Sequence, residues 1–255
     1  MDRDKTIYTL GLLLAFLLLL AGRDLGPLTL PVTAPADNVT VAESQPLIAL
    51  TFDDGPFAPT TEPLLEELER RGVHATFFLI GEQIEGNEEL IRRMGAEGHQ
   101  IGIHTWSHVG LSGLNDRDFY SQVGRTANAL RGVIGGESFA IRPPYGYVDN
   151  RVEARAGAPI VLWSVDPEDW KYRDADRVAR HILENAKDGD IVLLHDIYPT
   201  SVQAALAVMD ALQDKGFRFV TVDEMAALRG VELQPGQVYR NFYPPAPSES
   251  EKTKS

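Results

Sequence analysis

The sequence predicts an α/β fold, a distorted or incomplete (β/α) barrel of about seven strands. Strand-like apolar segments alternate along the chain with segments whose apolar residues recur at helical spacing, which is typical of a parallel sheet covered by helices. The alternating part, residues 47–229, is shorter than the roughly 200 residues at which complete eight-unit barrels begin. Seven strand and helix units in this length therefore indicate a shortened or distorted barrel.

The first strand is predicted from the apolar run Leu47–Thr51, which continues into Phe52 and then into two adjacent carboxylates, Asp53 and Asp54. A continuous apolar run that is closed by glycine and proline is typical of a strand buried on both faces. The Asp-Gly pair is also common in β-hairpin turns. A hairpin would need a second alternating strand next, whereas a helical pattern follows, so we expect the carboxylates at the carboxyl end of a buried strand.

The remaining strands and helices alternate to the end of the barrel. Further strands are predicted at residues 75–80, 100–103, 139–141, 160–165, 191–194 and 217–222. Helices are predicted at residues 63–71, 88–97, 116–134, 174–187, 201–215 and 223–228. Functional side chains of a parallel barrel gather where its strands end, and every polar cluster that stands out in this sequence ends one of these strands.

Residues 1–22 are predicted to be an N-terminal membrane anchor or signal peptide. Residues 7–22 are uncharged and nearly all apolar, with a length between that of a signal-peptide core and that of a membrane span of about 20 residues. No convincing cleavage site follows them, which favours an uncleaved anchor, and either outcome places the rest of the chain outside the cytoplasm. Residues 23–45 are predicted to be a linker, residues 46–230 the folded domain, and residues 231–255 a C-terminal extension with a disordered tail.

Charge and cysteine content exclude several classes of function. The net charge of -13 argues against nucleic acid as a partner, because no basic stripe is available for phosphate contacts. The chain has no cysteine, which excludes disulfides, a thiolate nucleophile and any cysteine-ligated zinc or iron-sulfur site. A metal would therefore be bound by His, Asp and Glu. The sequence makes no prediction of the oligomeric state.

His104 and His108 are the strongest candidates for metal ligands. They lie four residues apart, so both imidazoles project to one side if the segment is helical or a tight turn. The simpler alternative is a pair of surface or capping histidines. Together with the oxygen of Asp54, the two nitrogens would leave coordination positions open for water and substrate, and borderline ions such as zinc fit this ligand set.

The segment Arg142–Gly146 (RPPYG) predicts a rigid turn after a strand. Its prolines fix φ and Gly146 permits an unusual backbone, so the amide of Tyr145 could be held pointing into a cleft. Arg142 could pair with Asp53. Taken alone, the segment would by default be interpreted as a surface Pro-Pro loop with a solvated arginine.

Two further strand ends carry acids, an indole and a histidine. The segment Ser164–Trp170 combines three acids with Trp170, and Leu193–Asp196 (LLHD) places His195 after a strand. A buried carboxylate near an imidazole keeps it protonated and oriented, as a general acid requires at neutral pH. A lone His or Trp is more often a satisfied core residue, and Glu168 and Asp196 are open to a simpler interpretation as solvated side chains.

Five of these segments, in this order, resemble the five motifs of the polysaccharide deacetylases with a NodB-type domain, carbohydrate esterase family 4. The resemblance covers residue 47 to about residue 229. It implies a distorted (β/α) barrel and metal-dependent removal of N-acetyl or O-acetyl groups from a glycan. Ile103 occupies a position where many members have a small polar residue, but it is not a ligand. The five segments are Thr51–Gly55 (TFDDG), His104–His108 (HTWSH), Arg142–Gly146 (RPPYG), Asp166–Trp170 (DPEDW) and Leu193–Asp196 (LLHD).

The resemblance also implies a role for each site residue. Asp54, His104 and His108 would hold a divalent metal, zinc in the first place, with cobalt, nickel or manganese as alternatives. Asp53 would be the general base, and Arg142 would keep it ionised.

For the other side of the site, the resemblance implies that Asp169 tunes His195 as the general acid. The backbone amide of Tyr145 would help to form the oxyanion site. Trp170 and Leu193 would line the pocket for the acetyl methyl group.

We therefore expect an exported, membrane-tethered deacetylase whose substrate is a cell-wall glycan, first of all the N-acetylglucosamine of peptidoglycan. A chitin-oligosaccharide deacetylase and an acetylxylan esterase remain alternatives, because the motifs define the reaction and not the polymer. A non-catalytic glycan-binding wall protein is a second class. A two-His-one-carboxylate iron oxygenase is a third, since it shares the ligand types.

Overall fold

The computed structural model describes residues 45–245. The predicted anchor at residues 1–22, the linker up to residue 44 and the last ten residues of the predicted tail lie outside the described residues. Among residues 45–245, no helix combines the length and the apolar character that crossing a membrane requires.

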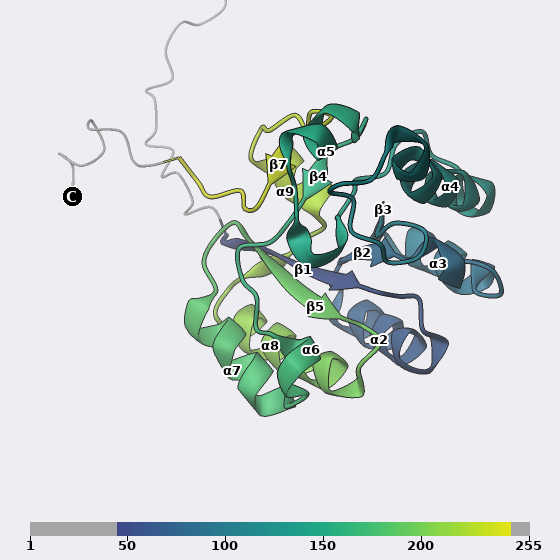
Figure 1. Ribbon diagram of the computed structural model, residues 1–255. Coiled ribbons are helices and arrows are strands. Elements are labelled where there is room, and N and C mark those ends of the chain that lie inside the picture. Colours follow the sequence, from purple (N-terminus) through teal and green to yellow (C-terminus); the bar gives the residue numbers. More distant parts are fainter. Residues whose placement is uncertain (1–44, 246–255) are drawn as a thin grey trace, which may run out of the picture. The chain divides into compact units, whose positions relative to one another are not determined.

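The sheet is built around β1 (Leu47–Asp53), every residue of which is buried. On one side β1 pairs in parallel with β5 (Asp190–His195). On the other side it pairs in parallel with β2 (Thr76–Leu79), which pairs in turn with β3 (Gln100–Ile103). The short β6 (Arg218–Phe219) pairs with the start of β1. The carboxyl ends of β1, β2, β3 and β5 therefore meet at one edge (Figure 1).

The far wall of the barrel is only partly formed, as the sequence predicts. β4 is limited to Ile160–Val161, and the predicted strand at residues 139–141 is reduced to Ile141, which bridges Ile103 and Ile160. The strand predicted at residues 160–165 is interrupted: Val165 still bridges Val192 of β5, but the backbone carbonyls of residues 161 and 162 accept hydrogen bonds from the buried Arg142 side chain instead of extending a ladder.

A seventh strand, β7 (Val238–Tyr239), was not predicted. It pairs in parallel with β4 and lies in the part of the chain that follows the barrel repeats. Two residues give no period-2 pattern, so the sequence carries no strand signal there. The predicted strand at residues 217–222 is likewise shortened, because α9 already begins at Val222.

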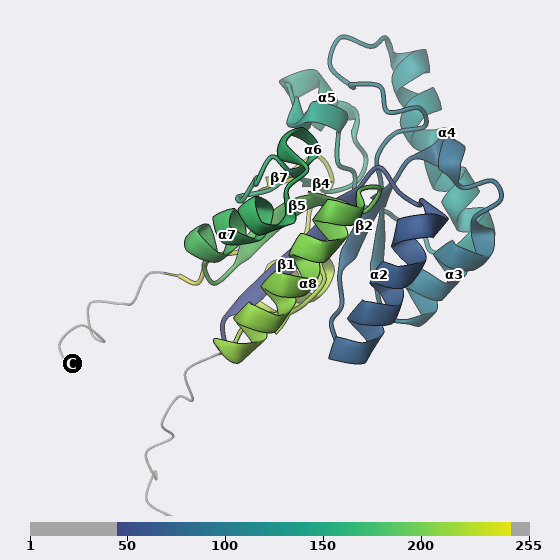
Figure 2. The same cartoon turned by 90° about the horizontal axis from the view of Figure 1, so that it is seen from below.

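Helices cover the outside of the sheet and follow one another around it (Figures 1 and 2). Six were predicted: α2 (Ala58–Arg71), α3 (Glu88–Ala96), α4 (Asp116–Ile134), α7 (Ala175–Asn185), α8 (Pro199–Asp214) and α9 (Val222–Leu228). α2 begins five residues earlier than predicted, because Pro59 lies in its first turn, where no N–H is needed. The unpredicted pieces are short: η1 (Gly81–Gln83), η2 (Pro144–Gly146), α5 (Asn150–Arg155) and α6 (Asp169–Tyr172).

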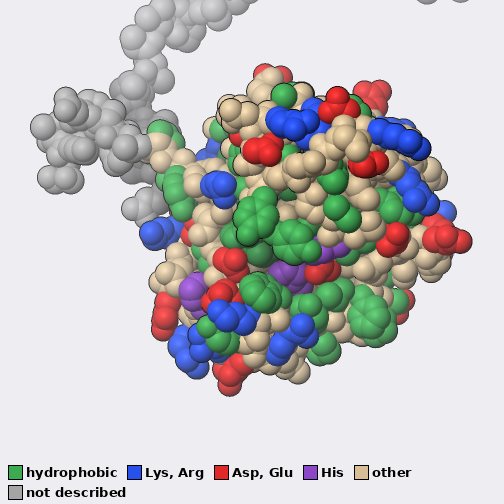
Figure 3. Space-filling view, viewed as in Figure 1, with side chains coloured by type: hydrophobic (Ala, Val, Ile, Leu, Met, Phe, Trp, Pro, Cys, Tyr) green, Lys and Arg blue, Asp and Glu red, His purple; other side chains and the backbone are tan. Residues whose placement is uncertain are grey.

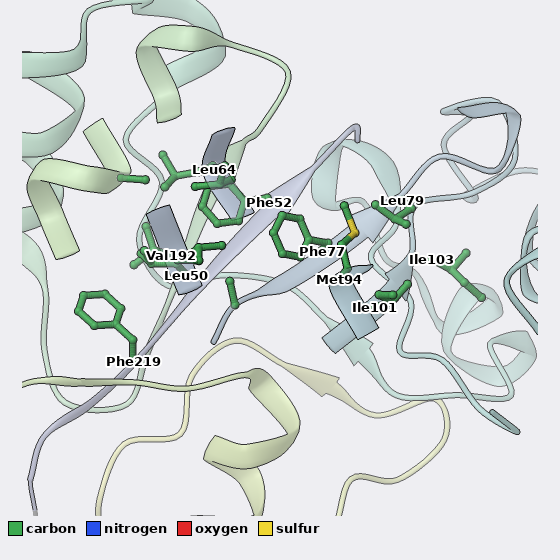
Figure 4. Close-up of a cluster of buried hydrophobic side chains, with 14 of the residues drawn as sticks. Leu50, Phe52, Leu64, Phe77, Leu79, Met94, Ile101, Ile103, Val192 and Phe219 are labelled. Atoms are coloured by element: carbon green, nitrogen blue, oxygen red, sulfur yellow. The ribbon is translucent and has the colours of Figure 1, made fainter. Parts of the chain in front are cut away.

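Alternation along β1 determines what faces the core and what faces the site. Ile48, Leu50 and Phe52 point towards the helices, where the Phe52 ring stacks on Phe77 with ring centroids 5.3 Å apart (Figure 4). Residues one position out of phase point to the other face of the strand. Asp53 is thereby delivered to the interior of the barrel rather than to the helix layer.

Candidate active site

Asp53 is held by a fully buried arginine. Only 2% of Asp53 is exposed, and its Oδ1 accepts a hydrogen bond of 2.8 Å from Nη1 of Arg142, the pairing expected from the sequence. Nη1 of Arg142 also donates to Oγ1 of Thr51 at 2.7 Å, while Nε and Nη2 donate to the carbonyls of Val161 and Leu162. A buried ion pair is tolerated when its remaining groups are hydrogen-bonded in this way. The pair fixes Asp53 and leaves its Oδ2 facing the site, 3.7 Å from Nε2 of His104.

Asp54 leaves the strand with a left-handed backbone, φ 72°. Its Oδ1 is buried and has no hydrogen-bond partner among the described residues. Nε2 of His108 lies 3.3 Å from this oxygen and Nε2 of His104 lies 3.5 Å from it. A buried carboxylate oxygen without a partner is costly unless something else binds it.

The tautomer of His104 follows from the hydrogen bond that its Nδ1 makes. Nδ1 lies 2.7 Å from the carbonyl oxygen of Arg142, so Nδ1–H donates there and Nε2 presents a lone pair to Asp54. Burial lowers the pKa of His104, which keeps the imidazole neutral. Neutral imidazole with one fixed N–H is the form in which histidine binds metals.

The segment from His104 to His108 is a tight turn and not a helix, so the second of the two predicted geometries is correct. Thr105 and His108 have positive φ, 65° and 56°. Oε1 of Gln122 accepts the backbone N–H groups of Trp106 and Ser107 and fixes the turn. The two imidazole rings lie 5.0 Å apart as a result.

These three side chains fit a small divalent cation. In a tetrahedral site with metal–ligand bonds of 2.0–2.1 Å, two ligand atoms are about 3.3 Å apart. The separations of 3.3 and 3.5 Å between Asp54 Oδ1 and the two Nε2 atoms match this value. Asp54, His104 and His108 form the one group of three potential ligands close enough to share an ion within residues 45–245.

On the other side of Asp54, His195 is paired with a buried carboxylate. Nδ1 of His195 lies 2.8 Å from Oδ1 of Asp169, and Oδ2 of Asp169 accepts hydrogen bonds from the His195 backbone N–H and from Oγ of Ser201. Burial by itself would lower the pKa of His195. The hydrogen bond and charge of Asp169, with the charges of Asp53 and Asp54, outweigh it and raise this pKa to about 9. His195 is therefore protonated at neutral pH, with Nε2 4.0 Å from Oδ2 of Asp54.

The turn after Ile141 contributes one wall of the site. The left-handed backbone that the sequence permits at Gly146 is present there, with φ 68°. Tyr145, which has a side chain, also adopts it, with φ 65°. A Cβ on Gly146 would lie 2.8 Å from the Trp163 indole, which leaves no room for another residue. The Tyr145 ring is 64% exposed and packs edge-on against His108.

These groups surround one cavity of about 490 Å³. All the predicted site residues line it except Arg142 and Asp169, which lie buried behind Asp53 and His195. Histidine and acidic side chains lie in a hollow bordered by hydrophobic ones on the face shown in Figure 3. Trp170 is half-exposed and Leu193 is buried, so together they provide an apolar wall.

Several residues of the site were missed at the sequence level. Tyr147 and Trp163 also line the cavity, and so does Asp166, which begins the motif segment Asp166–Trp170 but was given no role. Tyr147 follows the Pro-Pro turn directly and Trp163 follows β4, so their nearness to motif segments was the available signal. Ser201 gave no signal, because its bond to Asp169 spans 32 residues.

Glu168 and Asp196 were both open to interpretation as solvated side chains. This interpretation is wrong for Asp196 and correct for Glu168. Asp196 is 0% exposed, and burial raises its pKa to about 7. Its neighbour in the chain, His195, belongs to the site, whereas Asp196 accepts a hydrogen bond from Thr61 of α2 and lies against Gly55. Glu168 lies at the surface, where it pairs with Lys171.

Comparisons with known proteins agree with this geometry. A family model described as polysaccharide deacetylase matches residues 40–159. A peptidoglycan N-acetylglucosamine deacetylase of Listeria monocytogenes is 41% identical over 210 residues, which cover 82% of this chain and 44% of that protein. The chain thus spans less than half the length of this relative. A peptidoglycan N-acetylglucosamine deacetylase of Bacillus cereus is 36% identical, with 75% of this chain and 94% of that protein covered.

A solved structure extends the similarity to the fold. The peptidoglycan deacetylase of Bacillus subtilis superimposes with a TM-score of 0.71 at 36% identity, covering 73% of this chain and 93% of that one. Its fold is the same α/β arrangement of a parallel sheet and covering helices, and the incomplete barrel predicted from the sequence is confirmed.

Proposed function

The chain belongs to the polysaccharide deacetylase family, and we propose that it removes the acetyl group from N-acetylglucosamine of peptidoglycan, by hydrolysis of the amide bond. One observation carries the proposal: Asp53 and His195 flank, from two neighbouring strands, the three side chains that fit a single cation. An amide is a poor electrophile, so its hydrolysis needs an activated carbonyl, a base for the water and an acid for the leaving nitrogen.

We assign the cation to Asp54, His104 and His108. The fit of their spacing to bonds of about 2.0–2.1 Å and the mixed nitrogen and oxygen donors favour zinc. Such an ion, when bound, polarises a carbonyl oxygen and makes water more acidic.

Asp53 is proposed as the general base. Arg142 occupies its Oδ1, which leaves Oδ2 to accept the proton of the attacking water. The ion pair also prevents Asp53 from turning away, because the guanidinium is itself fixed by Thr51 and two carbonyls.

His195 is proposed as the general acid. The water oxygen forms a bond to the acetyl carbon, the carbon–nitrogen bond breaks, and the nitrogen leaves as an amine with the proton that Nε2 of His195 donates. Asp169 supports this step in two ways: it holds Nδ1–H, which aims Nε2 at the site, and it keeps the imidazole charged.

The remaining groups are proposed to position the acetyl group. The backbone N–H of Tyr145 donates to the oxyanion that develops on the carbonyl oxygen. Trp170 and Leu193, which line the cavity, hold the methyl group away from water.

The place of action is also a proposal. The uncharged apolar segment at residues 7–22 supports export and anchoring in the cell membrane, and relatives named for peptidoglycan support a substrate in the wall. A membrane-bound enzyme beside the wall would reach its glycan with a linker of the length of residues 23–45.

The experiment that tests the function is acetate release by the full chain from purified peptidoglycan, chitin oligomers and acetylated xylan, with and without a chelator. We expect release from peptidoglycan that chelation abolishes and added zinc restores. Preferred release from xylan or chitin would refute the assignment of peptidoglycan as the substrate. Binding of the glycan without any acetate release would refute the assignment as an enzyme.

A further inference from the structure

Asp196 is a buried carboxyl group that the proposed reaction does not use. It is 0% exposed, and its Oδ1 has no hydrogen-bond partner among the described residues. It follows His195 at the end of β5, just as Asp54 follows Asp53 at the end of β1. Because Asp53 and His195 are paired in register, Asp54 and Asp196 leave neighbouring strands side by side.

The other carboxyl oxygen of Asp196 ends a short chain of hydrogen bonds. The backbone N–H of Phe57 donates to Oγ1 of Thr61 at 3.0 Å, and Oγ1 of Thr61 lies 2.5 Å from Oδ2 of Asp196. A hydroxyl carries a single proton. Since Thr61 already accepts from Phe57, its proton goes to Asp196, and the direction of the chain is fixed.

The carboxyl group of Asp196 also lies directly against Gly55. A Cβ on Gly55 would be 2.6 Å from both oxygens of Asp196, so no residue with a side chain fits there. On the side away from β5, the carbonyl of Gly55 accepts a hydrogen bond of 3.0 Å from the backbone N–H of Ile80, which directly follows β2. Residues 55–57 are thereby held on both sides.

This loop carries the strained metal ligand. Asp54 has φ 72°, a left-handed conformation that residues with a side chain seldom adopt and that persists only where the surroundings enforce it. Within residues 45–245, Oδ1 of Asp54 has no hydrogen bond that could fix its direction. The contacts of the following residues with Asp196 and Thr61 supply that constraint.

We propose that Asp196 and Thr61 are positioning residues that hold the loop after Asp54 so that Oδ1 of Asp54 meets the two imidazoles at one cation. The inference rests on the metal site of the proposed function. Neither residue touches the substrate or the ion in this role. Their effect is on the affinity for the metal, which typically falls 10- to 100-fold when a group that orients a ligand is lost.

The test measures zinc affinity of the metal-free full chain by competition with a chromophoric chelator. Thr61→Val removes the hydroxyl at constant shape, and we expect zinc binding at least roughly tenfold weaker. Thr61→Ser and Asp196→Asn retain the hydroxyl and the accepting oxygen, and both should bind zinc within about threefold of the wild type. Thr60→Val is the matched control, because Thr60 donates its hydroxyl to the carbonyl of the same Phe57 but not to Asp196.

Thermal unfolding in excess chelator separates positioning from folding. Thr61→Val and Thr60→Val should have similar midpoints without metal and differ only in zinc affinity. Equal zinc affinity of Thr61→Val and the wild type would overturn the proposal. Zinc affinity of Asp196→Asn as low as that of Thr61→Val would also overturn it, since the loss of affinity would then come from the charge of Asp196 and not from its hydrogen bond. A wild-type chain that binds zinc but releases no acetate would refute the proposed function alone.

Discussion

Asp169→Asn tests how the site keeps its acid protonated. The substitution removes the charge beside His195 and leaves one amide oxygen in place of the two carboxylate oxygens that accept from Nδ1 and from the backbone N–H of His195. The hydrogen bond and the charge of Asp169 are the main contributions that raise the pKa of His195 to about 9, and burial opposes them. Without Asp169, burial prevails, and we expect this pKa at or below its ordinary value of about 6.5.

The expected loss follows from the fraction of His195 that carries a proton. At pH 7.5 an imidazole with a pKa of about 9 is roughly 97% protonated, whereas one with a pKa of about 6.5 is roughly 9% protonated. Protonation alone therefore lowers the rate about tenfold. Loss of the Nδ1 hydrogen bond also loosens the ring, so the total loss approaches the factor of about 10² to 10⁴ that a general acid contributes.

The assay is the pH dependence of kcat/KM for acetate release, with the same zinc occupancy in both proteins so that the effect of the cation on His195 cancels. The rate falls as pH rises through the pKa of the acid. The alkaline limb should therefore lie at clearly lower pH in Asp169→Asn than in the wild type, because the contribution of Asp169 to the raised pKa of His195 is lost, and it should stay in place in the surface control Glu168→Gln. An alkaline limb that does not move in Asp169→Asn would refute the assignment of His195 as the acid.

The other predictions concern the base, the ligands and the buried ion pair. Asp53→Asn should bind zinc like the wild type and lose a factor of about 10² to 10⁴ in kcat, measured by acetate release; near-normal turnover would remove it as the base. His104→Ala should contain no zinc by elemental analysis, whereas the exposed His181→Ala should contain one equivalent, and equal contents would contradict the ligand set. Arg142→Met should lower the free energy of unfolding in urea by about 3–5 kcal/mol, because it leaves a buried carboxylate unpaired; a loss below about 1 kcal/mol would contradict this. Without metal, stabilisation by protonated His195 is fully present below its unfolded pKa of about 6.5 and is lost as pH rises through about 9, on the order of 3 kcal/mol in total. His195→Ala should lack this slope in urea unfolding, and an identical slope would exclude His195 as its source.

The parts of the fold that the sequence predicts are those with a repeating apolar pattern. The run at Leu47–Thr51 gave the central strand, and the helix predicted at residues 116–134 is α4 with the same limits. The far wall has no such pattern. There the Arg142 side chain donates hydrogen bonds to the carbonyls of Val161 and Leu162, which a regular strand would use for its ladder. The local pattern of apolar residues does not indicate such a hydrogen bond, because the two partners are about 20 residues apart.

The site was predictable where its residues directly follow strands. Parallel strands bring their carboxyl ends together, so Asp53 and His195 line one cavity, and Arg142 lies behind Asp53 and pairs with it. Asp196 follows a strand in the same way, yet its hydrogen-bond donor is Thr61, 135 residues earlier in the chain. The sequence contains both residues but nothing that indicates their contact.

The direct test of the metal site is the position of the ion in crystals of the zinc-loaded protein, located by anomalous scattering at the zinc edge. We predict one strong peak about 2.0–2.2 Å from Asp54 Oδ1 and from Nε2 of His104 and His108, with Asp53 and His195 on either side of it. No peak at these three atoms, or a peak bound by other residues, would contradict the account.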